Sequence, residues 1–211
     1  MSRYLMFHKP AGCITANRDP RRKTVLDYFP EDVREELFPV GRLDRDTEGL
    51  LLLTDDGALT ARLLHPIYHV AKTYFLYAVG DMTEEKAERL SSGVPLDEAG
   101  KLSRPAQVLI GEKLLLPALK VPLSVKDARL CRRHPQTPVT ALTVTVTEGK
   151  KHQIKRMLLA VGCRVVYLKR VSMGNLVLDP SLAPGEARPL TGEEIDALYR
   201  AAGLPCSHGQ K

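Results

Sequence analysis

The stretch GRLDRDTEGLLLLTDDG, residues 41–57, most constrains the fold, because it predicts three consecutive elements. Its apolar run predicts a buried strand over residues 50–54, because a short continuous run bounded by polar residues is typical of such strands. The Asp-Asp-Gly sequence at 55–57 predicts a tight turn, since Asp and Gly favour turn conformations. The segment ALTARLLHP then predicts a short helix that Pro66 ends.

Two other periodicities recur along the chain. Segments that alternate apolar and polar residues predict strands within 72–80 and 141–147, and short apolar segments predict strands within 4–7 and 164–168. Segments with the helical period and capping signals predict helices within 83–93, 148–162 and 191–203, and a helical turn at 33–38. The last helix opens with a T-x-x-E capping box.

Two segments are less regular. Residues 105–117 predict two strands on either side of Gly111, and the proline-rich, basic segment 117–138 predicts a loop or irregular insertion. Strands and helices do not alternate regularly. The sequence therefore predicts an α+β fold with a largely antiparallel mixed sheet, flanked by helices and loops and organised in two sub-lobes.

Charge narrows the class of partner. The chain has 211 residues, a formal net charge of +6 and a pI of about 9.2, which favours anionic partners such as nucleic acid. Residues 149–170 contain seven Lys or Arg and no Asp or Glu. These bases begin at a predicted helix start, where backbone N–H groups also favour anions. The run is either a phosphate-binding surface or a solvated helix face.

Cysteine usage and the N-terminus indicate a cytoplasmic protein. The cysteines, Cys13, Cys131, Cys163 and Cys206, form no C-x-x-C pair, and the expectation is free thiols. No signal peptide is recognisable, and the apolar runs are too short to span a bilayer. The six histidines have no metal-ligand spacing, so no metal site is predicted.

The acids of residues 41–57 leave several roles open. Carboxylates could bind Mg²⁺, or one could act as a nucleophile or general base. The plainer interpretation is that most of them are structural. Asp44 differs by its place, because it lies between Leu43 and the loop that precedes a strongly apolar strand.

Five motifs in this sequence resemble one enzyme family in the family's own order. GRLDRDTEGLLLLTDDG closely resembles the signature G-R-L-D-x-x-[ST]-x-G-L-[LIV]-[LIV]-[LIV]-T-x-D-G of the ribosomal small-subunit (16S-type) branch of the pseudouridine synthases. FHKPAG at 7–12 is similar to the first motif, and HPIYHVAKTY at 65–74 to the segment that carries a conserved tyrosine. EGKKHQIKRMLLAVG at 148–162 resembles the third motif, and LDPSLAPGEARPLTGEEI at 178–195 the closing segment. The resemblance covers nearly the whole chain.

The resemblance implies site roles. The family's invariant aspartate falls on Asp44, its stacking tyrosine on Tyr74 and its basic residue after Gln-Ile on Lys155. Many members carry Arg at the last position, and Lys offers a point charge where Arg offers a bidentate fork. The positions expected to contact RNA or organise the site are Lys9, Arg42, Lys150, Lys151, Gln153 and Arg156.

The implied reaction breaks the N1–C1′ bond of a uridine and joins C5 to C1′. A carboxylate could attack C1′, add to C6 of the ring, or remove a proton next to the anomeric carbon. Each route needs an ionised aspartate, and a nearby cation would oppose the pKa rise that burial causes. An aromatic ring can hold the detached uracil, and the nucleotide must be flipped out or single-stranded. No cofactor and no metal are required.

One departure from the family is the start of the chain. Members commonly begin with a small RNA-binding domain of the S4 type, whereas here the first motif follows almost at once, so residues 1–211 are expected to form a single catalytic domain. The expected partner is ribosomal RNA or a ribosome-assembly intermediate, bound by a monomer, with 16S favoured over 23S by the closing segment. The alternatives are a catalytically silent RNA-binding or ribosome-assembly protein on the same fold and, more weakly, a Mg²⁺-dependent nuclease.

Overall fold

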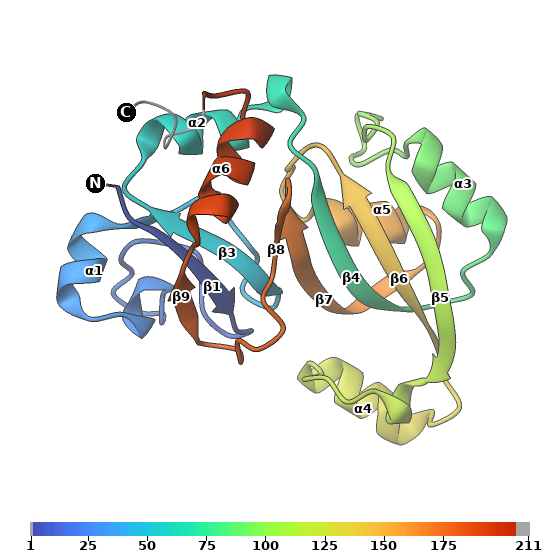
Figure 1. Ribbon diagram of the computed structural model, residues 1–211. Helices are drawn as coiled ribbons and strands as arrows, with labels where there is room; N and C mark the ends of the chain where they lie inside the picture. Colours follow the sequence, from blue (N-terminus) through green and yellow to red (C-terminus); the bar gives the residue numbers. More distant parts are fainter. Residues whose placement is uncertain (1, 206–211) are drawn as a thin grey trace. The chain divides into compact units, whose positions relative to one another are not determined.

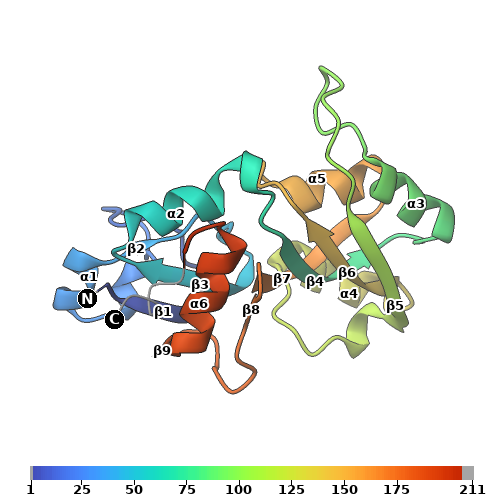
Figure 2. The same cartoon turned by 45° about the horizontal axis from the view of Figure 1, so that its top comes forward.

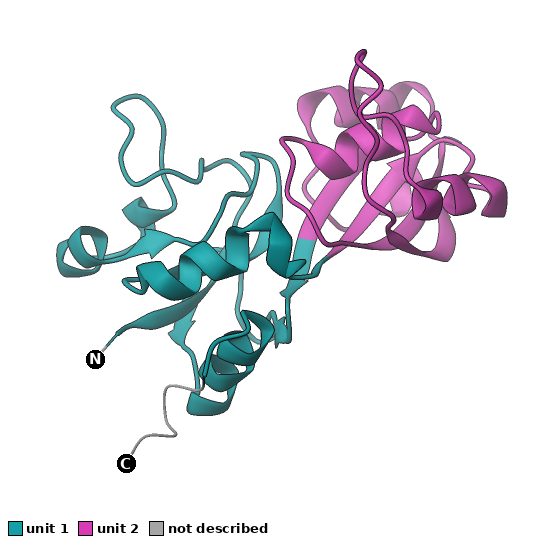
Figure 3. Cartoon of the chain, turned by 90° about the horizontal axis from the view of Figure 1, so that it is seen from above, with its two compact units in different colours: residues 1–72, 170–211 teal, residues 73–169 magenta. Residues whose placement is uncertain are grey.

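Two compact units make up the chain (Figure 3). The computed structural model describes residues 2–205. Unit 1 comprises Met1–Lys72 and Arg170–Lys211, and unit 2 comprises Thr73–Lys169. The chain passes between them inside two strands, β4 (Lys72–Val79) and β7 (Arg164–Met173). The two units agree with the predicted sub-lobes, and the single-domain organisation stays a prediction.

Unit 1 is built on antiparallel strands (Figure 1). They are β1 (Tyr4–Lys9), β2 (Phe38–Pro39), β3 (Glu48–Thr54), β8 (Leu176–Val177) and β9 (Ala187–Pro189). β1 pairs with β3 and β9, β2 pairs with β3, and β8 pairs with the end of β7. The antiparallel sheet predicted from the sequence is confirmed in this unit.

Helices cover the strands of unit 1. They are α1 (Glu31–Glu36), α2 (Gly57–Leu64) and α6 (Gly192–Ala201), with 3₁₀ turns at Leu26–Tyr28 and Pro66–Tyr68. Leu59 and Leu63 of α2 and Leu198 of α6 share a buried cluster with Leu50 and Leu52 of β3. The predicted capping box of α6 is present, with Thr191 and Glu194 bonded reciprocally.

The four-leucine run is buried on both faces of β3. Leu50 and Leu52 face the cluster under α2 and α6, and Leu51 and Leu53 point the opposite way because side chains alternate along a strand. All four have 0% exposure. On the second face, Phe7 of β1 stacks against the rings of Tyr28 and Phe29. A strand without a solvent face needs no polar alternation, which explains the run.

The Asp-Asp-Gly sequence after β3 begins a helix, so the predicted turn is wrong. Asp56 is the N-cap of α2, and its carboxylate accepts from the Leu59 amide at 2.9 Å. The same side chain also accepts from the hydroxyls of Tyr4 and Tyr199 at 2.9 and 2.6 Å. Asp is favoured at turns and at N-caps for the same reason, namely its short acceptor side chain. Because α2 follows directly, Asp56 serves as its N-cap and not as a turn residue.

Unit 2 contains strands in the order β5-β6-β4-β7. β5 (Gln107–Leu115) pairs antiparallel with β6 (Pro138–Val146). The two strands predicted around Gly111 are one strand, with a register shift between Ile110 and Lys113. A Cβ at Gly111 would lie 3.2 Å from the Ala141 carbonyl oxygen, so glycine marks a close approach inside the bulge.

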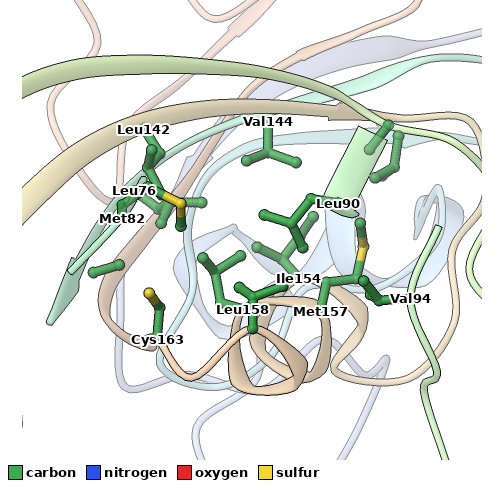
Figure 4. Close-up of a cluster of buried hydrophobic side chains, with 14 of the residues drawn as sticks. Leu76, Met82, Leu90, Val94, Leu142, Val144, Ile154, Met157, Leu158 and Cys163 are labelled. Carbon is green, nitrogen blue, oxygen red and sulfur yellow. The ribbon is translucent and has the colours of Figure 1, made fainter. Parts of the chain in front are cut away.

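The three α-helices of unit 2 pack against its strands. α3 (Glu84–Ser92) and α5 (Gln153–Ala160) form one cluster with the strands, including Leu90, Met157 and Leu142 (Figure 4). Thr83 caps α3 and Gly93 ends it, as predicted. Leu76 and Ala78 of β4 join this cluster, whereas their neighbours Tyr77 and Val79 face a second cluster on the other side of the strands.

The second cluster holds a helix that the sequence did not predict. α4 (Val125–Arg133) lies within residues 117–138, which were expected to be loop or irregular structure. Its N-cap Ser124 accepts from the Asp127 amide, a local signal that the surrounding prolines obscured. Leu130 and Cys131 pack against Leu116, Val139 and Val166, on the side of the strands opposite α5 (Figures 1 and 2).

Candidate active site

Asp44 lies in a tight turn of unit 1, between β2 and β3. The Thr47 amide donates to the Asp44 carbonyl oxygen at 3.1 Å, so the chain reverses over Arg45 and Asp46. The Asp44 side chain is partly exposed, whereas Leu43 before it and Thr47 after it are buried. The turn is therefore fixed at both ends and keeps this aspartate near solvent.

Residues that follow β1 hold the Asp44 turn from the side. Thr15 Oγ1 accepts from the Leu43 amide at 3.1 Å and donates to the Leu43 carbonyl oxygen at 2.9 Å. The Gly12 amide donates to the Arg45 carbonyl oxygen at 2.7 Å, and Arg45 Nε donates back to the Gly12 carbonyl oxygen at 3.2 Å. The FHKPAG and GRLD motifs thus form one hydrogen-bonded assembly, in which Thr15 is a member that pattern reading missed.

Lys9 is an interior residue, which corrects the RNA contact predicted for it. The side chain has 0% exposure, and its ammonium donates to the carbonyl oxygens of Pro10 and Thr47 at 2.9 Å each. A longer contact of 3.4 Å reaches the Arg45 carbonyl oxygen. A lysine without exposed surface cannot meet a phosphate. It acts instead as a clamp on the backbone of the Asp44 turn.

The charge of Lys9 is balanced within the same turn. Burial lowers the pKa of Lys9 because the charged form loses its hydration. The ionisable side chains of Cys13, Asp46, Glu48 and Asp44 act in the opposite direction and raise this pKa. The clamp therefore also supplies positive charge to the region of Asp44.

The last residue of GRLDRDTEG, Gly49, lies where the backbone of β3 comes very close to β7. Its φ is 107°, and a Cβ there would lie 2.2 Å from the carbonyl oxygen and 2.7 Å from the amide nitrogen of Arg170. Only glycine permits this approach of the β3 backbone to β7. The Arg170 side chain adds a hydrogen bond from Nε to the Leu50 carbonyl oxygen at 2.8 Å.

Two cations of unit 1 are buried behind this contact. Arg170 has 2% exposure and Lys72 has 8%. Burial, together with the positive charge of Arg170, lowers the pKa of Lys72 to about 8, although its ammonium donates to the Val70 carbonyl oxygen at 2.9 Å. Arg170 had been included in the basic run that could face phosphates, and its burial corrects that interpretation.

Tyr74 is in unit 2, at the start of β4. It is partly exposed and packs against the cluster formed by α3, α5 and the strands. The neighbouring Thr73 hydroxyl hydrogen-bonds to the Thr145 hydroxyl of β6 at 2.9 Å, which fixes this end of the strand. The predicted strand position is confirmed, and the stacking role stays a prediction.

Gln153 holds the loop before α5 together, in line with the organising role allowed for it, and the RNA contact stays a prediction. It has 5% exposure. Its Oε1 accepts from the Lys150 amide at 2.9 Å, and its Nε2 donates to Glu148 Oε1 at 2.7 Å. The Lys150 ammonium pairs with the second Glu148 oxygen at 3.2 Å and donates to the Leu102 carbonyl oxygen at 2.9 Å. Glu148 lies just before the acid-free run 149–170, and its carboxylate thus fixes the loop that leads into α5.

The other candidate cations differ in their solvent exposure and in their ion-pair partners. Arg42 and Lys151 are exposed, and Lys155 on α5 is partly exposed. Arg156 makes an ion pair of 3.7 Å with Asp97 and donates to the Lys151 carbonyl oxygen at 3.3 Å. The acid-free run therefore finds carboxylate partners elsewhere in unit 2. Arg42 and Lys151 are the two RNA-contact candidates with well-exposed side chains.

Residues 2–205 contain neither a cluster of metal ligands nor a membrane-spanning helix. In that range, no group of three or more His, Cys, Asp or Glu side chains is placed to hold a metal ion. Nor does that range contain a helix long and apolar enough to cross a membrane. Cys13, Cys131 and Cys163 are free thiols, as expected, and Cys206 lies outside the described residues.

Comparison with known proteins decides the family. The family model described as RNA pseudouridylate synthase matches residues 3–160, more than half of the chain. This chain belongs to that family. It is therefore an RNA pseudouridine synthase, and the enzyme class and family fold predicted from the motifs are confirmed.

Similar synthases cover most of the chain. An uncharacterized RNA pseudouridine synthase of Bacillus subtilis, YtzG, is 45% identical over 92% of this synthase and 72% of its own length. The ribosomal small subunit pseudouridine synthase A of Escherichia coli is 38% identical over 93% of this synthase and 74% of its own length. A crystal structure of a pseudouridylate synthase aligns with a TM-score of 0.76 and 33% identity, covering 94% of this chain and 74% of that one.

Proposed function

We propose that this synthase isomerises one uridine of small-subunit ribosomal RNA, with Asp44 as the reacting carboxylate. The observation that carries the proposal is the Asp44 turn, whose backbone is held by hydrogen bonds from Lys9, Gly12 and Thr15 while the Asp44 side chain keeps access to solvent. The 38% identity to the small-subunit synthase of Escherichia coli supports the target. The 16S-type resemblance of the closing segment, residues 178–195, agrees with this target.

The reaction exchanges one bond to C1′ for another. The N1–C1′ bond breaks, the uracil rotates, and C5 bonds to C1′; the proton on C5 is lost, and N1 gains one. Asp44 assists by attacking C1′, by adding to C6, or by removing a proton next to C1′. In each case it must be ionised. We assign Lys155 the role of favouring the ionised form, and Tyr74 the role of stacking on the detached uracil.

Positive charge near Asp44 supports its proposed role as the reacting carboxylate. An aspartate that reacts as a carboxylate benefits from nearby positive charge, and the Lys9 ammonium lies against the backbone of the turn, although burial lowers its pKa. The Lys9 ammonium is occupied by backbone carbonyls, so it cannot compete as a proton donor to the substrate without leaving those bonds. Arg42 and Lys151 are the proposed contacts to the RNA backbone around the flipped nucleotide.

The test is release of tritium from RNA labelled at uridine C5, because that hydrogen leaves when C5 forms its new bond. We expect Asp44→Asn to lose at least about a thousand-fold in rate while its RNA affinity stays within about twofold, since the change removes charge but little volume. Tyr74→Phe should retain far more activity than Tyr74→Leu, because the phenyl ring still stacks. Unchanged tritium release by Asp44→Asn would rule out the mechanism.

The target is tested by mapping pseudouridines in ribosomal RNA from cells with and without the gene. We expect one small-subunit site to disappear and to return with the wild-type gene but not with Asp44→Asn. Loss of a large-subunit site alone would refute the target while leaving the chemistry intact. A wild-type protein that releases no tritium from any ribosomal RNA or assembly particle would favour the silent RNA-binding alternative.

A further inference from the structure

α4 of unit 2 presents a face made of cations. Lys126, Arg129, Arg132 and Arg133 are all exposed. With about 100° per residue, these positions fall within one third of the helix circumference. Within residues 2–205, none of the four side chains makes a hydrogen bond or an ion pair. We call these four residues the α4 stripe.

The one acid of α4 does not neutralise the stripe. Asp127 has 4% exposure and points to the opposite side, where it pairs with Arg164 at 2.5 Å and accepts from the Ser124 hydroxyl. By contrast, α3 in the same unit mixes Lys86 and Arg89 with three glutamates. Mixed charge is the usual pattern of a solvated helix. α4 departs from it.

Helix stability explains only part of this pattern. Arg132 and Arg133 lie in the last turn, where cations favourably meet the negative end of the helix dipole. Lys126 lies in the first turn, where the dipole disfavours a cation, and Arg129 lies mid-helix. A helix selected for stability alone would place an acid at position 126. Helix stability therefore does not explain the cations at positions 126 and 129.

The stripe is held in place by the rest of unit 2. Leu130 and Cys131 pack into the cluster with Val139 and Val166, and the Asp127–Arg164 pair joins the helix to β7. Ser124 caps the helix. A charged tail would have to be ordered on binding, whereas a packed helix presents its cations without that entropic cost.

We propose that the α4 stripe is a second RNA-docking surface, which binds phosphates of the substrate RNA away from the nucleotide that is modified. Lys126 and Arg133 are about 10 Å apart along the helix axis, which lets the stripe meet more than one phosphate of a strand. Arg and Lys contacts to phosphates supply affinity without reading sequence. The inference rests on the proposed function, since it takes the same RNA as ligand.

The experiment compares two triple variants of the full chain. The stripe variant is Lys126→Gln, Arg129→Gln and Arg133→Gln. The control is Arg89→Gln, Lys101→Gln and Lys113→Gln, whose cations lie in the same unit beside acids, with Lys113 paired to Asp81 at 3.5 Å. Each lowers the formal net charge from +6 to +3, so a difference between them reports position and not total charge.

RNA affinity is measured against salt on a long small-subunit RNA fragment and on a short stem-loop containing the target. We expect the stripe variant to lose about 2 units of the slope of log K against log salt on the long RNA, at about 0.7–0.9 per phosphate contact. KM in the tritium assay should rise at least about tenfold there, with kcat unchanged. The stem-loop should be affected less, and the control should resemble wild type in both assays.

Other outcomes overturn the inference. Equal slopes and equal KM values for the two variants would show that only net charge matters. Loss of binding to vesicles of anionic phospholipid, with RNA binding unchanged, would assign the stripe to a membrane surface instead. A wild-type protein that releases no tritium, while the stripe variant alone loses salt-dependent RNA binding, would refute the proposed function and leave the docking surface standing.

Discussion

The two units use the same residue types in opposite ways. In unit 1, Lys9, Lys72 and Arg170 are buried, and their hydrogen bonds go to backbone carbonyls of the chain itself. In unit 2, the α4 stripe is exposed, and its side chains make no hydrogen bond or ion pair with other described residues. Lys9 holds the turn that carries Asp44 and Arg170 holds the strand after it, whereas the exposed cations remain available to a ligand.

Backbone context separates these roles. Lys9 ends a strand beside a turn whose carbonyls point inward, so its ammonium finds acceptors within the protein. The stripe cations project from the outer face of a helix, whose own carbonyls are already bonded along the axis. Net charge counts both groups equally. The effective RNA-binding charge of this protein is therefore smaller and more localised than its sequence total implies.

The largest expected effect comes from closing the space that Gly49 leaves for β7. Gly49→Ala should lower the free energy of unfolding by at least about 3 kcal/mol, because its Cβ would lie 2.2 Å from a backbone oxygen at a positive φ. Gly57→Ala is the matched control, with nothing within 4 Å of its Cβ, and should change stability by less than about 1 kcal/mol. Urea unfolding measures both, and similar losses would contradict the close-packing argument.

The next effect tests the Lys9 clamp. Lys9→Met keeps the length of the side chain but leaves buried carbonyls without their donor, which should cost about 2–4 kcal/mol of unfolding free energy. Lys120→Met in unit 2 changes an exposed lysine and should stay within about 0.5 kcal/mol of wild type. At a temperature where the variant is folded, kcat should also fall, because the Asp44 turn loosens. Equal stability of the two variants would show that the clamp is not needed.

Sequence reasoning found the elements whose signals are local. β1, β3, β4, β6, α3, α5 and α6 follow from hydrophobic period and capping residues, and the motifs pointed to Asp44, Tyr74 and Lys155. It missed α4, because prolines on both sides of the helix concealed a short amphipathic segment. It also divided β5 at Gly111, because a bulge and a turn both place glycine in an extended segment.

The burial of charged groups could not be predicted from pattern. Lys9 and Gln153 occupy motif positions that are typical of ligand contacts, yet both are consumed by backbone and side-chain partners within their own unit. Thr47 and Glu148 can be recognised as the partners of Lys9 and Gln153 only in the folded chain. A sequence gives the type of a polar side chain, and tertiary contacts decide whether it serves the fold or the ligand.

A smaller effect is expected from the pH dependence of stability. Folding lowers the pKa of Lys72 from 10.5 to about 8, so between these values the unfolded chain binds more protons than the folded one. Unfolding free energy should therefore rise with pH across this window by about 1–2 kcal/mol from Lys72, and the contribution should fade out about one unit below pH 8. In Lys72→Met this increment should vanish. The readout is the difference between wild type and variant in urea unfolding at pH 8 and pH 10.

The control for this pH effect is Lys101→Met, which changes an exposed lysine. It should follow the wild-type curve. If Lys72→Met and Lys101→Met gave the same pH profile, the positive charge of Lys72 would have to be compensated in the folded protein.

The smallest effect concerns a single exposed cation. Lys151→Gln should leave the free energy of unfolding within about 0.5 kcal/mol of wild type, because the side chain projects into solvent before α5. It should reduce the salt slope of RNA binding by about 0.7–0.9, the value for one phosphate contact. Lys113→Gln is the control, since its ammonium is paired with Asp81. A slope change in Lys113→Gln alone, measured by RNA titration at several salt concentrations, would reverse the assignment of which cations of unit 2 face the RNA.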